Sequence, residues 1–474
     1  MSTARPRQFD RNLVVIGGGS AGLVSALVAV KVGASVTLVE AGEMGGDCLN
    51  TGCVPSKALI HAASLVHGAR DAARLGLLGD PGVVNSAAAM AYVRRSIERV
   101  APHDSVKRFL GMGVDVRRGY ARITSPYSVE INGAVLTTRS IIVATGAAPV
   151  VPDIPGLTEY VTSETIWALP EAPARLLILG GGPIACELAQ AFARLGSKVT
   201  IANTGDRLLA REDDEVSAHV AARLVAEGVT ILPDHSAVAA SGTEMMFERG
   251  ARVAYDRVLV AIGRKARVAG FGLEQLGVRL GPTGTIQTNQ YLQSSCPSLY
   301  ACGDVAGPYQ FTHAASKQGW HATINALFGQ LHRIRIDYGG MPAVTFCDPE
   351  IARVGLNERE AKAQGVAYEV TTKPIDDLDR AIVDAAHGFV KILTKPGSDR
   401  ILGATVVAPR AGEMLAELTL AMHYGIGLKK LFATIHPYPT YTEANRDTAG
   451  AWRQAHAPVW VFPLLGRYQR WLRG

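Results

Sequence analysis

The sequence predicts an α/β fold that contains two similar strand–turn–helix units. Two observations lead to this prediction. A glycine-rich segment at residues 13–22 and a second one at residues 175–185 each lie between an apolar strand and an apolar helix. The chain has 474 residues, of which 48% are hydrophobic, and this is enough for two to four domains with buried cores.

The first glycine-rich segment has the spacing of a dinucleotide-binding turn. Gly17 permits a tight turn, Gly19 lets the backbone approach a pyrophosphate, and Gly22 allows the helix to pack closely on the strand. The helix N-terminus offers free N–H groups to the phosphates. Glu40 ends the next strand, 18 residues after Gly22, where an acid can bind a ribose hydroxyl pair. We therefore expect a Rossmann-like unit here.

The same pattern recurs at Gly180, Gly182 and Ala185, and its second strand ends at Asn203. One such turn is weak support for a bound nucleotide, because many glycine-rich turns only reverse the chain. Two copies in the same strand–turn–helix context predict two bound dinucleotides, with electrons passing between them.

A cysteine pair, Cys48 and Cys53, follows the first unit. Pro55 suits the first turn of a helix, so we expect Cys53 at a helix N-terminus with Lys57 one turn further on. Both features favour a thiolate, and the short spacing lets the pair close a disulfide at little cost in chain entropy. The alternative is two buried structural cysteines. The glycine-rich setting and the nearby lysine oppose it.

The composition argues against several other classes of protein. The remaining cysteines are widely spaced, so neither a disulfide scaffold nor a metal site is predicted. Residues 1–12 do not resemble a secretion signal, which favours a cytoplasmic protein, where disulfides are usually catalytic. The net charge of +6 is mild, and no nucleic-acid-binding module is visible. Residues 13–30 carry no charge, but the glycine turn predicts a strand and a buried helix rather than a membrane span.

Residues 45–57 resemble the active-site signature of the class I pyridine nucleotide–disulfide oxidoreductases. This family includes dihydrolipoamide dehydrogenases, glutathione reductases and mercuric reductases. The chain most resembles the branch of dihydrolipoamide dehydrogenases and mercuric reductases. Residues 144–146 resemble its middle flavin motif, residues 300–305 its ribitol-binding segment, and residues 346–355 the start of its dimerisation domain. The resemblance covers roughly residues 12–450.

The resemblance implies two Rossmann-like dinucleotide-binding domains, for FAD and NAD(P), followed by an α+β dimerisation domain, and it implies a homodimer. The expected segments are a first FAD-binding part (1–150), an NAD(P)-binding domain (151–268), a return to the FAD domain (269–340), the dimerisation domain (341–450) and a tail (451–474).

The resemblance also implies how electrons move. NADPH or NADH gives hydride to FAD, and FAD reduces the Cys48–Cys53 disulfide. Cys53 faces the flavin, and Cys48 attacks the acceptor. Lys57 lies near flavin N5, where a cation stabilises the charge left by the hydride, and Glu187 pairs with Lys57.

The remaining cofactor assignments follow from the same motifs. Asn203 is not the acid that would favour NAD, and a nearby arginine can bind a 2′-phosphate, so NADPH is favoured over NADH. The candidate cofactor-binding residues are Gly17, Gly19, Gly22, Glu40, Lys57, Ala121, Thr145, Gly146, Gly180, Gly182, Ala185, Asn203, Arg207, Gly263 and Asp304.

The C-terminal signature differs from that of glutathione and lipoamide reductases. Tyr438 stands where their catalytic histidine would be, while Glu443 keeps its place. A phenol is mainly a proton donor at neutral pH, whereas an imidazole can both take and give protons. Prolines on either side of Tyr438 favour extended backbone, so His436 would share its face and is a second candidate for proton transfer.

The acceptor therefore stays open. We expect a small disulfide or a related thiol-reactive molecule. The alternatives are a metal ion, as in mercuric reductases, a quinone, or lipoamide with tyrosine in place of the usual histidine. A mercuric reductase usually adds a cysteine pair near its C-terminus, but the last cysteine here is Cys347.

The tail is basic and aromatic. From Arg446 onward the sequence has five arginines and one aspartate, which gives a net charge of +4. Apolar residues at helical spacing predict one apolar face over 464–472. We expect this face to pack on the dimerisation domain. The alternative is contact with a partner or with the inner face of a membrane.

Overall fold

The computed structural model describes residues 5–474. The chain forms two compact units, one of Met1–Leu208 and Leu224–Asp337 and the other of Leu209–Arg223 and Tyr338–Gly474. The glycine-rich turns and the cysteine pair lie in the first unit, and the C-terminal signature lies in the second.

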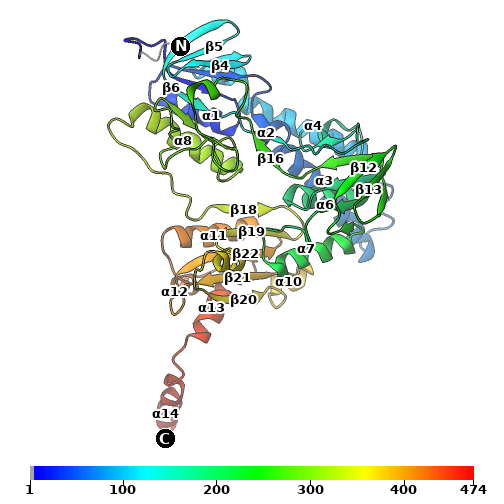
Figure 1. Cartoon of the computed structure of the whole chain (residues 1–474). Coiled ribbons are helices and arrows are strands. Elements are labelled where there is room, and N and C mark those ends of the chain that lie inside the picture. Colours follow the sequence, from blue (N-terminus) through cyan, green and yellow to red (C-terminus); the bar gives the residue numbers. More distant parts are fainter. Residues whose placement is uncertain (1–4) are drawn as a thin grey trace. The chain divides into compact units, whose positions relative to one another are not determined.

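The first glycine-rich turn lies in a seven-stranded sheet (Figure 1). Its central strand β1 (Arg11–Ile16) is fully buried from Leu13 to Ile16, as expected for a parallel strand covered on both faces. Helices α1 (Ser20–Lys31) and α8 (Thr312–Phe328) pack together beside it. The parallel strands are β2 (Val36–Glu40), β3 (Asp115–Arg118), β6 (Ala134–Val143) and β17 (Leu299–Ala301). The antiparallel strands β4 (Ala121–Ser125) and β5 (Ser128–Ile131) extend the sheet.

The second glycine-rich turn follows β9 (Arg175–Leu179) and opens α6 (Pro183–Arg194). Strand β9 belongs to a five-stranded parallel sheet with β8 (Val161–Thr162), β10 (Lys198–Ala202), β11 (Thr230–Leu232) and β15 (Arg257–Val260). A three-stranded meander follows, made of β12 (Ala237–Ser241), β13 (Glu244–Phe247) and β14 (Arg252–Ala254). A two-stranded ladder joins β7 (Ala147–Pro149) to β16 (Arg264–Ala266).

Both turns have the backbone conformation for which glycine was expected. Gly17 and Gly180 have φ of 109° and 115°, a region that side chains other than glycine rarely adopt. A Cβ on Gly22 would overlap the carbonyl oxygen of Gly17, so this glycine allows α1 to approach the turn. In the second copy Ala185 takes that position and is fully buried.

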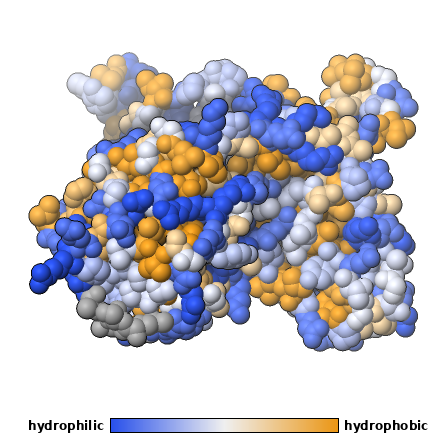
Figure 2. Space-filling view, turned by 90° about the horizontal axis from the view of Figure 1, so that it is seen from above, coloured by the Kyte–Doolittle hydropathy of each residue, from blue (hydrophilic) through white to orange (hydrophobic). Residues whose placement is uncertain are grey.

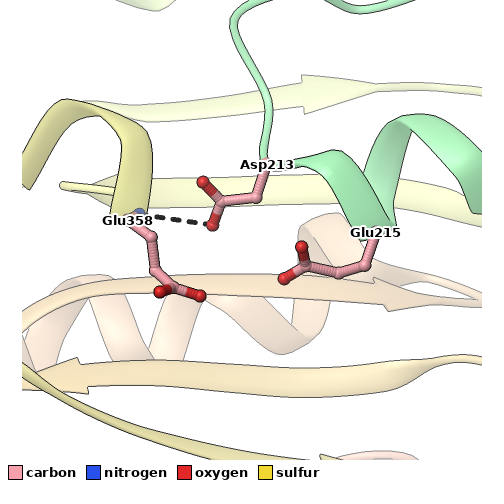
Figure 3. Close-up of side chains that lie close together, drawn as sticks. All are labelled: Asp213, Glu215 and Glu358. Carbon is pink, nitrogen blue, oxygen red and sulfur yellow. Dashed lines mark hydrogen bonds between the residues drawn. The ribbon is translucent and has the colours of Figure 1, made fainter. Parts of the chain in front are cut away.

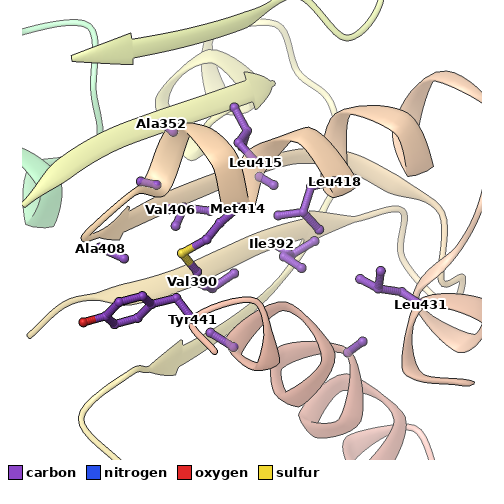
Figure 4. Close-up of a cluster of buried hydrophobic side chains, with 14 of the residues drawn as sticks. Ala352, Val390, Ile392, Val406, Ala408, Met414, Leu415, Leu418, Leu431 and Tyr441 are labelled. Atoms are coloured by element: carbon purple, nitrogen blue, oxygen red, sulfur yellow. The ribbon is translucent and has the colours of Figure 1, made fainter. Parts of the chain in front are cut away.

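The second unit is built on a five-stranded antiparallel sheet. Its strands in spatial order are β18 (Pro342–Thr345), β19 (Glu350–Gly355), β22 (Ile401–Ala408), β21 (Phe389–Thr394) and β20 (Glu369–Pro374). Helix α11 (Ala411–His423) packs on β19 and β22, and α13 (Glu443–Ala455) packs on β20 and β21. Figure 4 shows the apolar core, in which Met414, Leu415 and Leu418 of α11 lie beside Val390 and Ile392 of β21. Shorter helices are α9 (Glu358–Ala363), α10 (Asp379–Asp384) and α12 (Leu428–Ala433).

The chain ends in α14 (Val461–Arg473), drawn in red in Figure 1. The tail is helical, as expected, but none of the residues in α14 is buried. The expected packing of this helix on the dimerisation domain is therefore not seen. Exposed apolar side chains also occur elsewhere, as Figure 2 shows by the orange residues scattered among blue ones. Among the described residues, no helix has the length and apolar character needed to span a membrane.

Candidate redox site

The loop that carries Cys48 is packed directly against the first glycine-rich turn. Gly45 and Gly46 both have positive φ, and Gly45 pairs with Gly19 in an isolated parallel bridge. A Cβ on Gly46 would lie 2.7 Å from the Cα of Gly19, so the two backbones can come this close only because Gly46 lacks a side chain. The cysteine loop thus lies beside the turn expected to hold the FAD pyrophosphate.

The two cysteines lie in consecutive helices, a short one and a long one. Cys48 lies in α2 (Gly46–Asn50), and Cys53 is the first residue of α3 (Cys53–Arg74), as the position of Pro55 predicted. Both are free thiols and partly exposed. They are therefore not two buried structural cysteines. The other four cysteines are buried.

The two thiols are electrostatically unequal. The hydrogen bond from Cys48, together with a contact to Thr312 and the charge of Lys57, lowers the pKa of Cys53 to about 6 against the opposing effect of burial. The same contact with Cys53 raises the pKa of Cys48. These directions favour Cys53 as the thiolate of the pair, and its position at the N-terminus of α3 favours the same charge.

Thr312 is a functional residue that the sequence reasoning missed. It is the first residue of α8, and its Oγ1 lies 3.2 Å from Cys53 Sγ. A hydroxyl at this distance can donate a hydrogen bond to the thiolate. The two residues are 259 positions apart in the chain, so no local pattern could have linked them.

Lys57 and Glu187 form an ion pair with Nζ 2.9 Å from Oε2. Glu187 belongs to α6 and its side chain is only 8% exposed, while Lys57 belongs to α3. The pair therefore joins the helix that follows the cysteines to the helix that follows the second glycine-rich turn. A buried carboxylate with this partner fixes the direction of the lysine.

Asp304 lies in a charged group that includes Arg264. Burial raises the pKa of Asp304, and the guanidinium of Arg264, with Nε 3.9 Å from Oδ2, opposes this effect. Arg264 also forms an ion pair with Asp47, next to Cys48 in the chain. Arg264 was not among the residues expected from the sequence, although it directly follows the candidate Gly263, whose φ is 136°.

The residues around the first turn fit a bound dinucleotide. The carboxylate of Glu40 accepts hydrogen bonds from the backbone N–H groups of Gly18 and Gly42, which fixes it at the end of β2. Thr145 donates its hydroxyl to the carbonyl of Arg267 over 2.7 Å, and Gly146 has φ of 69°. Ala121 differs from these candidate cofactor-binding residues, because it belongs to β4 and its side chain packs in an apolar core cluster. Only its backbone could contact a cofactor.

The side chain of Asn203 packs against the second glycine-rich turn and holds the loop that follows β10. Its amide donates to the carbonyl oxygens of Gly205 and Arg207, over 3.2 and 2.7 Å. A Cβ on Gly181 would overlap the Asn203 side chain, so the loop that carries Arg207 is held against the glycine-rich turn.

In the second unit, Tyr438 and His436 lie in different surroundings. Tyr438 is 70% exposed, and its hydroxyl donates to Asp379 over 2.6 Å. The His436 side chain is 5% exposed, with Nε2 2.8 Å from Glu417 and Nδ1 3.1 Å from the carbonyl of Thr434. The two side chains, expected to share one face, are held by different partners, His436 by Glu417 and Tyr438 by Asp379.

Glu443, the third candidate residue of the C-terminal signature, is the first residue of α13. Its carboxylate accepts a hydrogen bond from the backbone N–H of Thr440 over 3.0 Å.

A cluster of three carboxylates in the second unit looks at first like a metal site. Asp213, Glu215 and Glu358 place their oxygens close together (Figure 3). The ammonium of Lys391 lies among them, 2.7 Å from Asp213 and 2.6 Å from Glu358, and it also contacts Glu215. Burial opposes the charge of Lys391, but the three carboxylates raise its pKa. The cluster is therefore a buried ion network that already contains its cation.

Comparison with known proteins agrees with this geometry. Residues 11–319 match the family model described as pyridine nucleotide–disulphide oxidoreductase, and residues 341–449 match the dimerisation domain of the same family. The chain is 34% identical to a mercuric reductase of Staphylococcus aureus, over 94% of this chain and 82% of that protein. It is 35% identical to a dihydrolipoyl dehydrogenase of Thermus scotoductus, over 93% of this chain and 97% of that protein.

Solved structures show the same fold. The flavoprotein disulfide reductase RclA of Escherichia coli, in its Cu(II) complex, has a TM-score of 0.82 and 28% identity, covering 94% of this chain and 99% of that one. LpdA of Mycobacterium tuberculosis has a TM-score of 0.84 and 26% identity, covering 92% and 99%. The dimerisation domain supports a homodimer. The chain belongs to the pyridine nucleotide–disulphide oxidoreductases and is an FAD-dependent enzyme that uses NAD(P)H.

Proposed function

We propose that Cys48 passes electrons from NADPH and FAD to a small disulfide or a related thiol-reactive acceptor. The observation that supports this most directly is the unequal thiol pair. Cys53 is stabilised as a thiolate by Cys48, Thr312 and Lys57, which suits the internal thiol of the pair. We assign the exchange with an external molecule to Cys48, which would lose its proton as it attacks.

In the reductive half-reaction, the first glycine-rich turn and Glu40 would hold FAD, which would supply two-electron transfer from the nicotinamide to the Cys48–Cys53 disulfide. Lys57, held in place by Glu187, would stabilise the negative charge that hydride transfer creates. Thr312 would stabilise the Cys53 thiolate once the disulfide opens.

In the oxidative half-reaction, the Cys48 sulfur attacks one sulfur of the acceptor and releases the other as a thiol, which takes up one proton. The Cys53 thiolate then attacks the Cys48 sulfur. This step re-forms the internal disulfide and releases the second thiol with a second proton. Two electrons and two protons thus reach the acceptor in each cycle.

We propose that Tyr438 supplies a proton in this half-reaction and that, with Glu443, it reaches Cys48 of the partner subunit. Its exposure and its hydroxyl favour it as the donor. His436 is less suited, because both ring nitrogens already face oxygen acceptors and its side chain is almost fully buried.

A second candidate acceptor is a soft metal ion, treated as a substrate. Two adjacent cysteine sulfurs suit such an ion. Among the similar proteins are mercuric reductases and an RclA studied as a Cu(II) complex. A quinone and lipoamide are the remaining alternatives on the same scaffold.

NADPH is the proposed coenzyme. The Asn203 amide holds the loop that carries Arg207, and an asparagine offers no carboxylate to pair with the ribose hydroxyls of NADH. Arg207 would then bind the 2′-phosphate.

The domain limits expected from the sequence, at residues 150, 268, 340 and 450, are also proposed. A cytoplasmic location is proposed because a disulfide that turns over catalytically suits a reducing compartment. Association with the inner face of a membrane is a further proposal that depends on α14 alone.

The test begins with the purified enzyme, anaerobic reduction by NADPH, and a panel of disulfides, quinones and metal ions as oxidants. Replacement of Cys48 by serine should leave reduction of the flavin intact and abolish turnover with disulfides. If the Cys48→Ser enzyme still reduces disulfides at the wild-type rate, the assignment of Cys48 is wrong. If only metal ions reoxidise the wild-type enzyme, the second candidate replaces the first.

A further inference from the structure

Helix α14 separates apolar and basic side chains on opposite faces. At 3.6 residues per turn, Leu464, Leu465, Tyr468, Trp471 and Leu472 fall on one side. Arg467, Arg470 and Arg473 recur every third residue on the other side. The helix has 13 residues and is about 20 Å long, and the apolar stripe covers nine of them, or about 13 Å.

None of the residues that the structure describes covers the apolar stripe. Trp471 is 75% exposed and Tyr468 is 52% exposed, and no residue of α14 is buried. A free helix of this length is marginal in water, since its stability usually comes from packing of the apolar face. We therefore expect the apolar stripe to be covered by a surface that does not belong to this chain.

The charge of the segment indicates the sign of that surface. Residues 448–474 contain four arginines and no aspartate or glutamate. The segment from Arg446 onward carries +4 of the net +6 of the chain. A negatively charged surface with an apolar interior can contact the arginines of the helix and also bury its apolar stripe.

The aromatic residues of the tail indicate which kind of acidic surface the helix binds. Trp460, Phe462, Tyr468 and Trp471 are all more than half exposed, at 68%, 57%, 52% and 75%. Tryptophan and tyrosine favour the boundary between headgroups and acyl chains, where one end of the ring is apolar and the other is wet. A helix of this composition lies in the plane of such a boundary, while arginine side chains extend to the phosphates.

We propose that α14 binds the surface of an anionic lipid bilayer and holds the enzyme there. The apolar stripe enters the headgroup boundary, and Arg467, Arg470 and Arg473 contact the lipid phosphates. No helix of the described residues crosses the bilayer in this arrangement. The proposal concerns the location of the enzyme and is independent of which acceptor Cys48 reduces.

The test is co-sedimentation of the FAD-loaded full-length enzyme with vesicles of phosphatidylcholine alone or with one third phosphatidylglycerol. We expect binding only to the anionic vesicles and its loss when the chain is cut after Ala457. Arg467→Gln and Arg470→Gln should each lower the partition coefficient by about fivefold. Leu465→Ser with Trp471→Ser should lower it further, because the apolar contact is lost.

Leu331→Ser is the matched control. Leu331 lies in the first unit and is 88% exposed, so its replacement removes exposed apolar surface away from α14 and should leave binding unchanged. Turnover of a soluble disulfide by every variant shows that the enzyme is intact. Equal binding of the full-length and shortened enzymes would overturn the proposal. So would equal binding to both kinds of vesicle. A loss of the dimer on shortening, measured by light scattering without any vesicle binding, would assign α14 to the subunit interface instead.

Discussion

The Nζ of Lys57 lies 2.9 Å from Oε2 of Glu187, and this ion pair connects the helix of the cysteines with the helix of the second glycine-rich turn. The carboxylate is buried and the ammonium is partly exposed. We therefore propose Glu187 as a positioning residue for Lys57.

Replacement of Glu187 by glutamine should slow reduction of the flavin by NADPH about 10- to 100-fold. The amide keeps the shape of the side chain but loses a hydrogen bond between charged groups, which contributes about 1.5–3 kcal/mol. Stopped-flow absorbance of the flavin measures this step directly. Glu227→Gln is the control, because Glu227 forms a similar buried pair with Arg194 of α6. This variant should lose stability and keep the rate, so an equal slowing in both variants would show a general structural effect.

Replacement of Thr312 by valine should raise the pKa of Cys53 by about one unit, since one hydrogen bond to the thiolate is lost. The sign follows from the pKa of about 6, which lies below the usual value for a thiol because the native contacts favour the thiolate. Ultraviolet titration of the thiolate in the reduced enzyme gives the shift. Thr312→Ser keeps the hydroxyl and should titrate like the wild type. An unchanged pKa in Thr312→Val would show that the threonine contact does not stabilise the charge.

Asp379 should set the alkaline limit of turnover if Tyr438 gives a proton. The hydrogen bond to Asp379 raises the pKa of Tyr438. Asp379→Asn lowers that pKa, so the phenol loses its proton at a lower pH and activity should fall earlier on the alkaline side. The pH profile of kcat/KM for a disulfide tests this.

Tyr441 and Asp384 offer a matched control for this experiment. The Tyr441 hydroxyl donates to Asp384 over 2.7 Å. Asp384→Asn changes a similar contact, yet should leave the pH profile as it is. Identical profiles for the wild type and Asp379→Asn would remove Tyr438 from the proton pathway.

Replacement of Lys391 by methionine should destabilise the second unit by about 3–5 kcal/mol, because it leaves the buried Asp213 without its cation. The loss should be largest at neutral pH and smaller in acid, where the carboxylates of the cluster become protonated and no longer repel one another. Urea unfolding at several pH values measures it. Lys373→Met removes an exposed pair with Asp377 and should cost less than about 1 kcal/mol. Equal costs for the two lysines would contradict a structural role for the network.

Arg207→Ala should lower kcat/KM for NADPH at least tenfold, since a charged hydrogen bond to the 2′-phosphate is lost, while NADH use changes little. The ratio of kcat/KM for NADPH to kcat/KM for NADH, compared between the wild type and Arg207→Ala, measures this effect. Arg249→Ala removes another exposed arginine of the same unit and serves as the control. A loss shared equally by both coenzymes would place Arg207 outside the phosphate site.

The sequence predicted the features that depend on short spacing. The two glycine-rich turns, Cys53 at the start of a helix and Lys57 one turn later all follow from local rules of chain geometry. Such rules act over a few residues, so they can be read before any tertiary contact is known.

The missed features all depend on segments far apart in the chain. Thr312 reaches Cys53 across 259 positions, and Arg264 reaches Asp47 across 217. Lys391 meets Asp213 across 178 positions. The tail helix was predicted correctly, but its expected contact was not, because an apolar stripe does not specify its partner.

The contact between Gly19 and Gly46 has a consequence for protein engineering. A methyl group on Gly46 would force the two backbones apart, so the cysteine loop and the dinucleotide turn are expected to depend on each other. Grafting the thiol pair into another nucleotide-binding domain would require residues 17–53 to be moved as a single cassette. Directed evolution of this enzyme is accordingly expected to keep Gly46 while the acceptor changes.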